Sequence, residues 1–548
     1  MKYIFLLNKY KIFIPIVILT VLSTGVWAQA VFQPYSYQFY QKLNSDLYST
    51  SSNEHTALRP LFIDDTLLMH HYDSLMNIGG NNKQHGGVYQ KLFNEHLIDY
   101  NRPGSTFYMD ILPDFSAGKD YASGQAINTA SLGLQLGGTI GHKFYYNVSA
   151  SQNTEVFPEY ITTYIKQVGI IPGQGIAYAN GSNGYQWSYV TATVSYTPLK
   201  FLNISAGRDK TFIGDGYRSM LLSDFASPYP FFKLIGNIAT LKYMVMWTYM
   251  NDPTSTSEYG IDRKKFGVFH YLDWSISNRL SFGFFESVIG FFTDDNGVAR
   301  PFDFNYISPI IYLKPINNAS NDPDKSLLGF TGKYKISNGI TWYGQFALDE
   351  FHSKDFFSSD GGFDNKYGWQ VGFRGTNLFT IKNLNFLVET NSAKPYTYEA
   401  RSSIENYSDN GEPLAHPWGA NFRELVGLLN YSYKRFDFSS EADLGRYGLD
   451  MNNLNYGKDI FELYTSPAKV YGNYTSQGLT TNMGYFEAKI AYVLNPKYNL
   501  RLEIGGIYRV EENSQYTDRT RVITIGLNSS FRQVYNDLAS FKAHGFGQ

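Results

Sequence analysis

The 548-residue chain contains no cysteine. This absence excludes a disulfide-stapled secreted domain, a zinc site with cysteine ligands and a lipid anchor on cysteine. Charged residues are scarce as well, because they make up 17% of the chain and leave a formal net charge of −2. Since this imbalance is small and no basic patch stands out, nucleic acid is not an expected partner.

Long hydrophobic runs are missing after the N-terminal segment. In that segment, lysines precede an apolar run over residues 12–22, and small residues follow at Ala28 and Ala30. This order predicts a secretory signal peptide over residues 1–30, cleaved after Ala28 or Ala30. A retained membrane anchor is the alternative, but the run is shorter than the roughly 20 residues that a spanning helix needs.

Aromatic residues and glycine, by contrast, are abundant: the chain has 46 Tyr, 41 Phe and 49 Gly. An exported chain of this composition, without helical spans, is typical of a transmembrane β-barrel. The strands of such a barrel alternate and therefore never form long hydrophobic runs. A soluble β-sandwich or solenoid is the alternative.

Several segments alternate between apolar and polar residues with a period of two. Leu500, Leu502 and Ile504 share one face of such a segment, whereas Arg501 and Glu503 lie on the other. The same alternation recurs over residues 132–136, 144–150, 486–494 and 521–531. The pattern predicts two-faced strands, but it does not by itself say which face meets lipid.

Strand length, aromatic placement and connection length favour the membrane barrel. The alternating runs reach about ten residues, as a tilted membrane strand requires. Aromatic residues near strand ends suit interfacial girdles: Tyr196, Phe201, Tyr243, Trp247, Tyr249, Tyr492 and Tyr508. A tight turn at residues 495–497 contrasts with long segments around 153–183, 291–324, 392–423 and 446–480, as in barrels with short periplasmic turns and longer outer loops.

We therefore predict an all-β transmembrane antiparallel barrel over residues 105–531, with about 16 to 18 strands and 18 favoured. Helical spacing at residues 37–48, 66–75 and 88–98 predicts a small N-terminal helical periplasmic region over residues 31–104. The polar tail over residues 532–548 carries no pattern that we can interpret.

Motifs for catalysis are not found. The chain has no Gly-rich phosphate loop, no H-E-x-x-H and no G-x-S-x-G. The adjacent His70 and His71 have no further ligands at a metal-binding spacing. Acidic neighbours such as Asp349 and Glu350 would point to opposite faces of a strand, so they do not supply the convergent carboxylates of a glycosidase. We therefore expect neither an enzyme nor a cofactor or metal site.

Three segments instead combine aromatic rings with charged and amide groups. Residues 207–230 read GRDKTFIGDGYRSMLLSDFASPYP, residues 391–401 read NSAKPYTYEAR, and residues 413–424 read PLAHPWGANFRE. Aromatic faces bind the C–H groups of sugars, while charged and amide groups bind sugar hydroxyls. These segments fit a sugar-binding surface, but they equally fit loops that simply pack into the mouth of a barrel.

The chain resembles the capsule assembly protein Wzi family of outer-membrane barrels in residues 207–230 and 413–424, in ETNSAKPYTY at residues 389–398 and in LDEF at residues 348–351. The resemblance extends over about residues 105–531. It implies an eighteen-stranded barrel in the Gram-negative outer membrane that acts as a lectin for capsular polysaccharide, and neither an enzyme nor a transporter. Phe212 and Ile213 stand where the enterobacterial members have tryptophans. The Tyr- and Asn-rich composition looks more like the Bacteroidetes branch, which includes the gliding-motility protein RemB and implies a role in motility or adhesion.

The predicted partners are outer-membrane lipid and a cell-surface or capsular polysaccharide. The candidate polysaccharide-binding residues are Arg208, Asp209, Tyr217, Tyr396, Tyr398, His416, Trp418, Arg423 and Glu424. Arg208 and Asp209 have a second interpretation as a charge cluster that braces the lumen, since buried charges must be paired. Two other functions remain open: a structural component of a gliding or secretion apparatus, with proteins of that apparatus as partners, and a diffusion porin.

Overall fold

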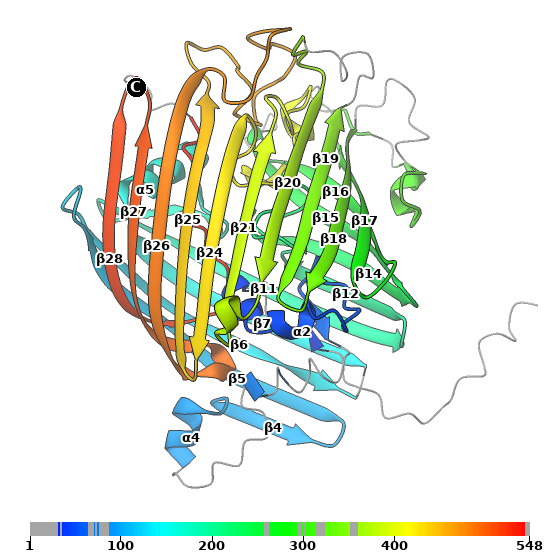
Figure 1. The fold of residues 1–548 in the computed structure, drawn as a ribbon, viewed down its shortest axis with the longest axis vertical. Helices are drawn as coiled ribbons and strands as arrows, with labels where there is room; N and C mark the ends of the chain where they lie inside the picture. The colour runs from blue at the N-terminus through cyan, green and yellow to red at the C-terminus, as the bar shows by residue number, and fades with distance from the viewer. Residues whose placement is uncertain are drawn as a thin grey trace, which may run out of the picture.

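The computed structural model describes residues 31–32, 36–63, 71, 74–75, 87–141, 143–256, 262–293, 298–300, 303–313, 324–350 and 360–542. A sheet of twenty strands dominates the structure. Two of them, β4 (Ile98–Arg102) and β10 (Tyr178–Asn180), are side strands that pair only with β5 and β11. The other eighteen close into an antiparallel barrel (Figure 1).

The wall strands follow one another around the barrel in chain order. They are β5 (Ser105–Asp120), β6 (Ala126–Ile140), β7 (Phe144–Val156), β11 (Gly184–Leu199), β12 (Leu202–Asp209), β14 (Tyr229–Ile238), β15 (Leu241–Thr256), β16 (Asp262–Ser275), β17 (Leu280–Phe291), β18 (Lys325–Ser337), β19 (Ile340–Glu350), β20 (Lys366–Gly375), β21 (Leu384–Ala393), β24 (Phe422–Tyr433), β25 (Phe436–Leu449), β26 (Leu479–Asn495), β27 (Leu500–Glu512) and β28 (Thr517–Ser529). Pairing of β28 with β5, from Val522↔Asp120 to Leu527↔Phe115, closes the barrel. The prediction of an antiparallel barrel, with 18 strands favoured, is confirmed.

The alternating residues of the wall strands face two different environments. On β27, the apolar Leu502 and Ile504 are 51% and 48% exposed on the outer surface. Glu503, between them, points into the lumen and lines a cavity there. The apolar face therefore points outward, which is the arrangement of a barrel surrounded by lipid and the opposite of a soluble sandwich. No helix of the described ranges is both long and apolar enough to cross a membrane.

The two ends of the barrel differ in their connections. At one end, called the turn end here, neighbouring strands are joined by segments as short as residues 200–201, 239–240 and 434–435. At the other, called the loop end, strands are joined by the long segments 157–183, 210–228, 394–421 and 450–478. The predicted division into short turns and long loops is present.

The predicted helical segments at residues 37–48 and 88–98 are both partly helical, but they lie in different parts of the structure. Helices α1 (Tyr37–Gln41) and α2 (Asn44–Leu47) match the prediction for residues 37–48, and they lie inside the lower part of the barrel (Figure 1). Helix α4 (Gly87–Phe93) matches the start of the third prediction, but the chain then enters β4 at Ile98. Most of residues 66–75 and the whole predicted signal peptide, residues 1–30, lie outside the described residues.

Candidate functional site

The connection between β12 and β14 does not extend outward from the loop end. Residues 210–228 turn back into the lumen, where every one of them is buried. Gly216 permits this approach, because a Cβ atom there would lie 2.5 Å from Glu389 Oε2 and 2.8 Å from Gln370 Oε1. Residues 210–228, most of the aromatic and charged segment 207–230, therefore fill part of the lumen.

Glu389, on β21, fastens this segment to the wall. Its carboxylate accepts hydrogen bonds from the backbone N–H groups of Tyr217 (3.0 Å) and Arg218 (2.9 Å). It also accepts one from the hydroxyl of Tyr343 on β19, at 2.8 Å. Because these donors come from the inward loop and from β19, two strands away in the wall, the carboxylate joins the loop to the wall.

Arg218 is the centre of a buried charge cluster. Its guanidinium donates to Glu424 Oε1 from Nε (3.1 Å) and Nη2 (2.8 Å), and it is ion-paired with Asp537. Asp443 Oδ2 lies 3.5 Å from the same Nη2. The partners come from β24, β25 and the segment after β28, so one fully buried arginine connects four parts of the chain. Such a cluster is stable only while its charges remain paired.

His416 completes this cluster from the β21–β24 connection. Its Nε2 lies 2.7 Å from Glu424 Oε2, and its Nδ1 accepts the backbone N–H of Trp418 at 3.1 Å. Burial lowers the pKa of His416 below its usual value, although the neighbouring Glu424 carboxylate acts in the opposite direction. A neutral imidazole with its proton on Nε2 satisfies both contacts.

The segment after β28 crosses the lumen from the turn end to the loop end. Along this path, the Tyr535 hydroxyl donates to Asp224 (2.6 Å), and the carbonyl of Asp537 accepts the indole N–H of Trp418 (3.0 Å). At the loop end, Lys542 Nζ lies 3.2 Å from Asp459 in the β25–β26 connection. The described part of the predicted polar tail, residues 532–542, thus fills the barrel from within.

Residues 36–61 fill the turn end in the same way. Tyr48 donates its hydroxyl proton to Asp215 at 2.9 Å, and Asn44 Oδ1 accepts a hydrogen bond from Arg374 of β20 at 2.9 Å. We call residues 36–61, 210–228 and 530–542 together the lumen plug.

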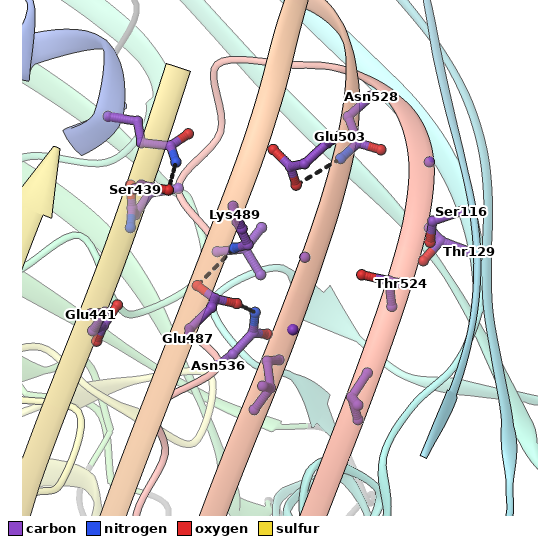
Figure 2. Close-up of a pocket in the computed structure, with 18 of the residues that line it drawn as sticks. Ser116, Thr129, Ser439, Glu441, Glu487, Lys489, Glu503, Thr524, Asn528 and Asn536 are labelled. Carbon is purple, nitrogen blue, oxygen red and sulfur yellow. Dashed lines mark hydrogen bonds and ion pairs between the residues drawn. The ribbon is translucent and has the colours of Figure 1, made fainter. Parts of the chain in front are cut away.

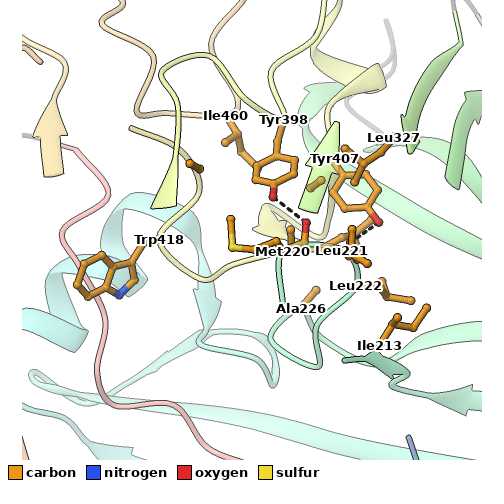
Figure 3. Close-up of a cluster of buried hydrophobic side chains, with 14 of the residues drawn as sticks. Ile213, Met220, Leu221, Leu222, Ala226, Leu327, Tyr398, Tyr407, Trp418 and Ile460 are labelled. Carbon is orange, nitrogen blue, oxygen red and sulfur yellow. Dashed lines mark hydrogen bonds between the residues drawn. The ribbon is translucent and has the colours of Figure 1, made fainter. Parts of the chain in front are cut away.

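An apolar cluster holds the centre of the lumen plug to the inward part of the β21–β24 connection. Met220, Leu221 and Leu222 lie among Tyr398, Tyr407 and Ile460 (Figure 3). The hydroxyls of Tyr398 and Tyr407 donate to the carbonyls of Met220 and Leu221, each at 2.7 Å. Each ring therefore packs its apolar body in the core while its hydroxyl satisfies a buried backbone carbonyl.

The nine predicted polysaccharide-binding residues divide between the lumen and the outer wall. Tyr217, Tyr396, Tyr398, His416, Trp418 and Glu424 are almost completely buried inside, and Asp209 faces inward near Thr193. Arg208 and Arg423 are exposed on the outer face of β12 and β24. The interpretation of Arg208 and Asp209 as one bracing cluster is wrong, because adjacent strand residues point to opposite faces. Arg218 has that role instead.

A polar cavity of about 270 Å³ remains between the lumen plug and the wall (Figure 2). Wall strands β25 to β28 contribute charged and amide groups, and the plug contributes Arg532 and Asn536. Lys489 is ion-paired with Glu487 at 2.7 Å, and Asn528 donates to Glu503 at 3.2 Å. The cavity is large enough for several water molecules, and no group of three or more potential metal-ligating side chains occurs in the described part of the chain.

Exposed aromatic side chains gather on the β25–β26 connection at the loop end. Tyr471 and Tyr474 are 61% and 57% exposed, and Lys469 Nζ lies 5.7 Å from the centre of the Tyr474 ring. Arg401, from the β21–β24 connection, donates from Nε to the Tyr464 hydroxyl at 2.7 Å. We call Arg401, Tyr464, Lys469, Tyr471 and Tyr474 the loop-end surface.

The loop-end surface was not among the predicted binding segments, although its sequence carries a signal. Residues 471–474 read YGNY within the segment 446–480, which was correctly predicted to be a long loop. Like the predicted sugar-binding segments, this stretch combines tyrosines with polar residues. Its tyrosines differ from theirs in being exposed, and exposure depends on which loops fold into the lumen.

No protein-family model matches the chain, and no curated protein matches its sequence. Among solved structures it is similar to Wzi of Escherichia coli, described as an outer-membrane protein involved in group 1 capsule assembly and a carbohydrate-binding β-barrel. That match has a TM-score of 0.53 at 14% identity and covers 92% of this chain and 100% of Wzi. The outer-membrane protein OprD of Pseudomonas aeruginosa matches with a TM-score of 0.39 at 11% identity, over 76% of this chain and 93% of OprD.

The likeness to Wzi, at this identity, shows a shared fold. The barrel fold matches that of an outer-membrane protein, as predicted. Membership of the Wzi family and the likeness to the RemB branch stay predictions.

Proposed function

We propose that the protein resides in the outer membrane, with its turn end in the periplasm, and binds a cell-surface polysaccharide at its loop end. The short turns of outer-membrane barrels face the periplasm and the longer loops face outward. The observation that carries the proposal is the loop-end surface, where two largely exposed tyrosines lie beside Lys469. Wzi, which shares the fold, is described as carbohydrate-binding.

The chemistry of the loop-end surface suits a polysaccharide, and an acidic one best. Tyrosine rings offer apolar faces for sugar C–H groups, and their hydroxyls both donate and accept hydrogen bonds. Lys469 and Arg401 add positive charge that attracts carboxylate or sulfate groups. The guanidinium of Arg401 is already oriented by the Tyr464 hydroxyl.

The loop that carries these tyrosines is held in place from below. Asn421 Oδ1 accepts the backbone N–H groups of Ser476 (2.7 Å) and Gln477 (3.2 Å), and its amide nitrogen donates to the carbonyl of Gly448 at 3.0 Å. Asn421 is completely buried. A loop ordered in this way before binding loses less conformational entropy when it meets a ligand.

The lumen plug argues against the porin alternative. Its three segments enter from the loop end and the turn end and are joined at Arg218 and Asp215. A conducting barrel of this size needs an aqueous path along its axis. The buried side chains of the lumen plug occupy that region.

Binding of the purified protein to polysaccharide from its own cells tests the proposal. We expect the double variant Tyr471→Ala, Tyr474→Ala to bind at least about tenfold more weakly, since each stacked ring contributes about 1 kcal/mol. Tyr249→Ala is the matched control, because Tyr249 is similarly exposed (48%) but lies on the barrel wall. Equal affinity of the double variant and the parent protein would refute the site.

The gliding or secretion alternative is favoured by a different feature. Helix α4 and strand β4 project beyond the turn end (Figure 1) and expose Val88, Ile98 and Tyr100. An apolar projection on the periplasmic side could contact other proteins of an apparatus. A deletion strain that keeps its capsule but no longer spreads on agar would support this function over polysaccharide attachment.

A further inference from the structure

Two arginines lie directly opposite each other on the outer wall of the barrel. Arg423 of β24 and Arg446 of β25 are partners in the strand register, and both are exposed. Like charges in this position destabilise a sheet. Arg446 donates from Nε to Asn482 Oδ1 at 2.9 Å, and Arg423 makes no ion pair with any residue that the structure describes. The pair therefore has the geometry of an anion site whose anion comes from outside the chain.

The pair sits where the apolar band of the wall ends. Arg423 is the second residue of β24 from the loop end, and Leu425 follows on the same face with 47% exposure. On β25, Leu444 precedes Arg446 on that face with 60% exposure. Two residues along a strand span about 6.8 Å. Positive charge and exposed leucine are thus stacked along the axis of the barrel.

The same arrangement, basic residues above exposed apolar residues, recurs farther around the wall on β28 and β5. Arg519 and Arg521 of β28 and Lys119 of β5 are exposed at the loop end, and Ile523 and Ile525 follow on the same face of β28. The cations of Arg521 and Lys119 each lie 5.8 Å from the ring centre of a tyrosine. We call Arg423, Arg446, Arg519, Arg521 and Lys119 the basic rim.

One carboxylate, Glu512 of β27, lies on this face between the two halves of the basic rim. In the strand register Arg446 is opposite Asn482, and Asn482 is opposite Glu512. Glu512 is therefore two strands from Arg446, about 10 Å at the usual strand spacing. At that distance, a single carboxylate does not neutralise the arginine pair.

We propose that the basic rim binds the phosphate groups of an acylated lipid in the leaflet around the loop end. Each guanidinium presents a planar fork that fits phosphate in a bidentate manner. The leucine and isoleucine side chains beneath pack against acyl chains of the same molecule. An anionic polysaccharide has no acyl chains, and free phosphate would leave the apolar rows without a partner. The site does not depend on polysaccharide binding, because it lies on the wall and shares no residue with the loop-end surface.

Native mass spectrometry of the detergent-solubilised protein tests this site, with diphosphorylated lipid A as the probe. We expect lipid A to remain bound to the parent protein. The variant Arg423→Gln, Arg446→Gln should bind at least about tenfold more weakly, because charge-assisted hydrogen bonds to phosphate are lost. Lys434→Gln is the matched control, since Lys434 is an exposed cation in the turn that joins the same two strands at the opposite end. It should bind lipid A as the parent does.

Several outcomes would overturn the proposal. Equal loss in Lys434→Gln would show that only net charge matters. Full displacement of lipid A by millimolar inorganic phosphate would show an anion site without lipid specificity, and displacement by delipidated polysaccharide would make the rim part of the glycan surface. Folding of each variant is checked by heat-modifiable migration in electrophoresis. The single variants Arg423→Lys and Arg446→Lys, which keep the charge, should retain part of the binding even if the double variant folds poorly.

Discussion

The lumen plug and the loop-end surface contain the same kinds of side chain, but they differ in what these side chains contact. In the plug, the tyrosine hydroxyls and cations contact other parts of the chain, as Tyr535 contacts Asp224 and Arg218 contacts Glu424. On the loop-end surface, Tyr471 and Tyr474 keep more than half of their area exposed. Tyrosine beside arginine therefore stabilises the structure in the lumen plug, whereas on the loop-end surface it is a candidate binding site.

The largest effect, on the stability of the lumen plug, is expected from removing the positive charge of Arg218. Arg218→Met would leave Glu424, Asp443 and Asp537 buried without their counter-charge, which costs about 3–5 kcal/mol. Because the wall strands keep their pairing, we expect the plug to unfold while the barrel remains. Single-channel recording in planar bilayers should then show conductance that the parent protein lacks.

Arg446→Met is the control for that experiment, because Arg446 lies outside the barrel. A closed channel in both variants would contradict the role assigned to the Arg218 cluster.

Trp418→Ala tests whether a predicted sugar-binding residue is structural. Its ring is 2% exposed and packs against Phe422 and Tyr447, so truncation should cost about 3–5 kcal/mol through the cavity it leaves. We expect a lower thermal midpoint with polysaccharide affinity close to that of the parent at temperatures where the variant is folded. The reverse result, unchanged stability with lost affinity, would return Trp418 to the binding site.

Acidity should affect the lumen plug through Glu412. Its carboxylate accepts hydrogen bonds from the backbone and hydroxyl of Ser227 at 2.9 and 2.7 Å. Burial raises its pKa from 4.5 to about 7, although these hydrogen bonds act in the opposite direction. Because the folded state binds the proton more tightly, this group's contribution to stability is greatest below pH 4.5 and declines, by at most about 3 kcal/mol, as the pH rises to about 7.

Unfolding midpoints measured across that range provide the test. Glu412→Gln should flatten the dependence between pH 4.5 and about 7. An identical profile in the variant would assign the dependence to other groups.

The smallest effect is expected at an exposed cation of the loop-end surface. Arg401→Gln should weaken polysaccharide binding by only about twofold to fivefold, because an exposed charge contributes up to about 1 kcal/mol. The difference should shrink at high salt, where such charges are screened. Affinity measured at low and high ionic strength tests this, and a loss that is independent of salt would mean that Arg401 acts through the position of Tyr464.

The wall of the barrel could be predicted from sequence, because each strand carries its own alternation. The same rule, applied to the predicted site residues, separates Arg423 from Glu424 and Arg208 from Asp209. The path of the loops could not be predicted. Whether residues 210–228 extend outward or fold inward depends on partners such as Glu389 and Asp537, which lie far away in the chain. The tail shows no local pattern, because the contacts of its described part, up to residue 542, are with the lumen.

A structure of the protein with an oligosaccharide cut from its own surface polysaccharide tests the central claim most directly. We expect sugar rings against Tyr471 and Tyr474, with Lys469 or Arg401 near an acidic group of the sugar and the lumen plug unchanged. Sugar bound inside the lumen, in the cavity beside Glu487 and Glu503 or in contact with Tyr217, would contradict it.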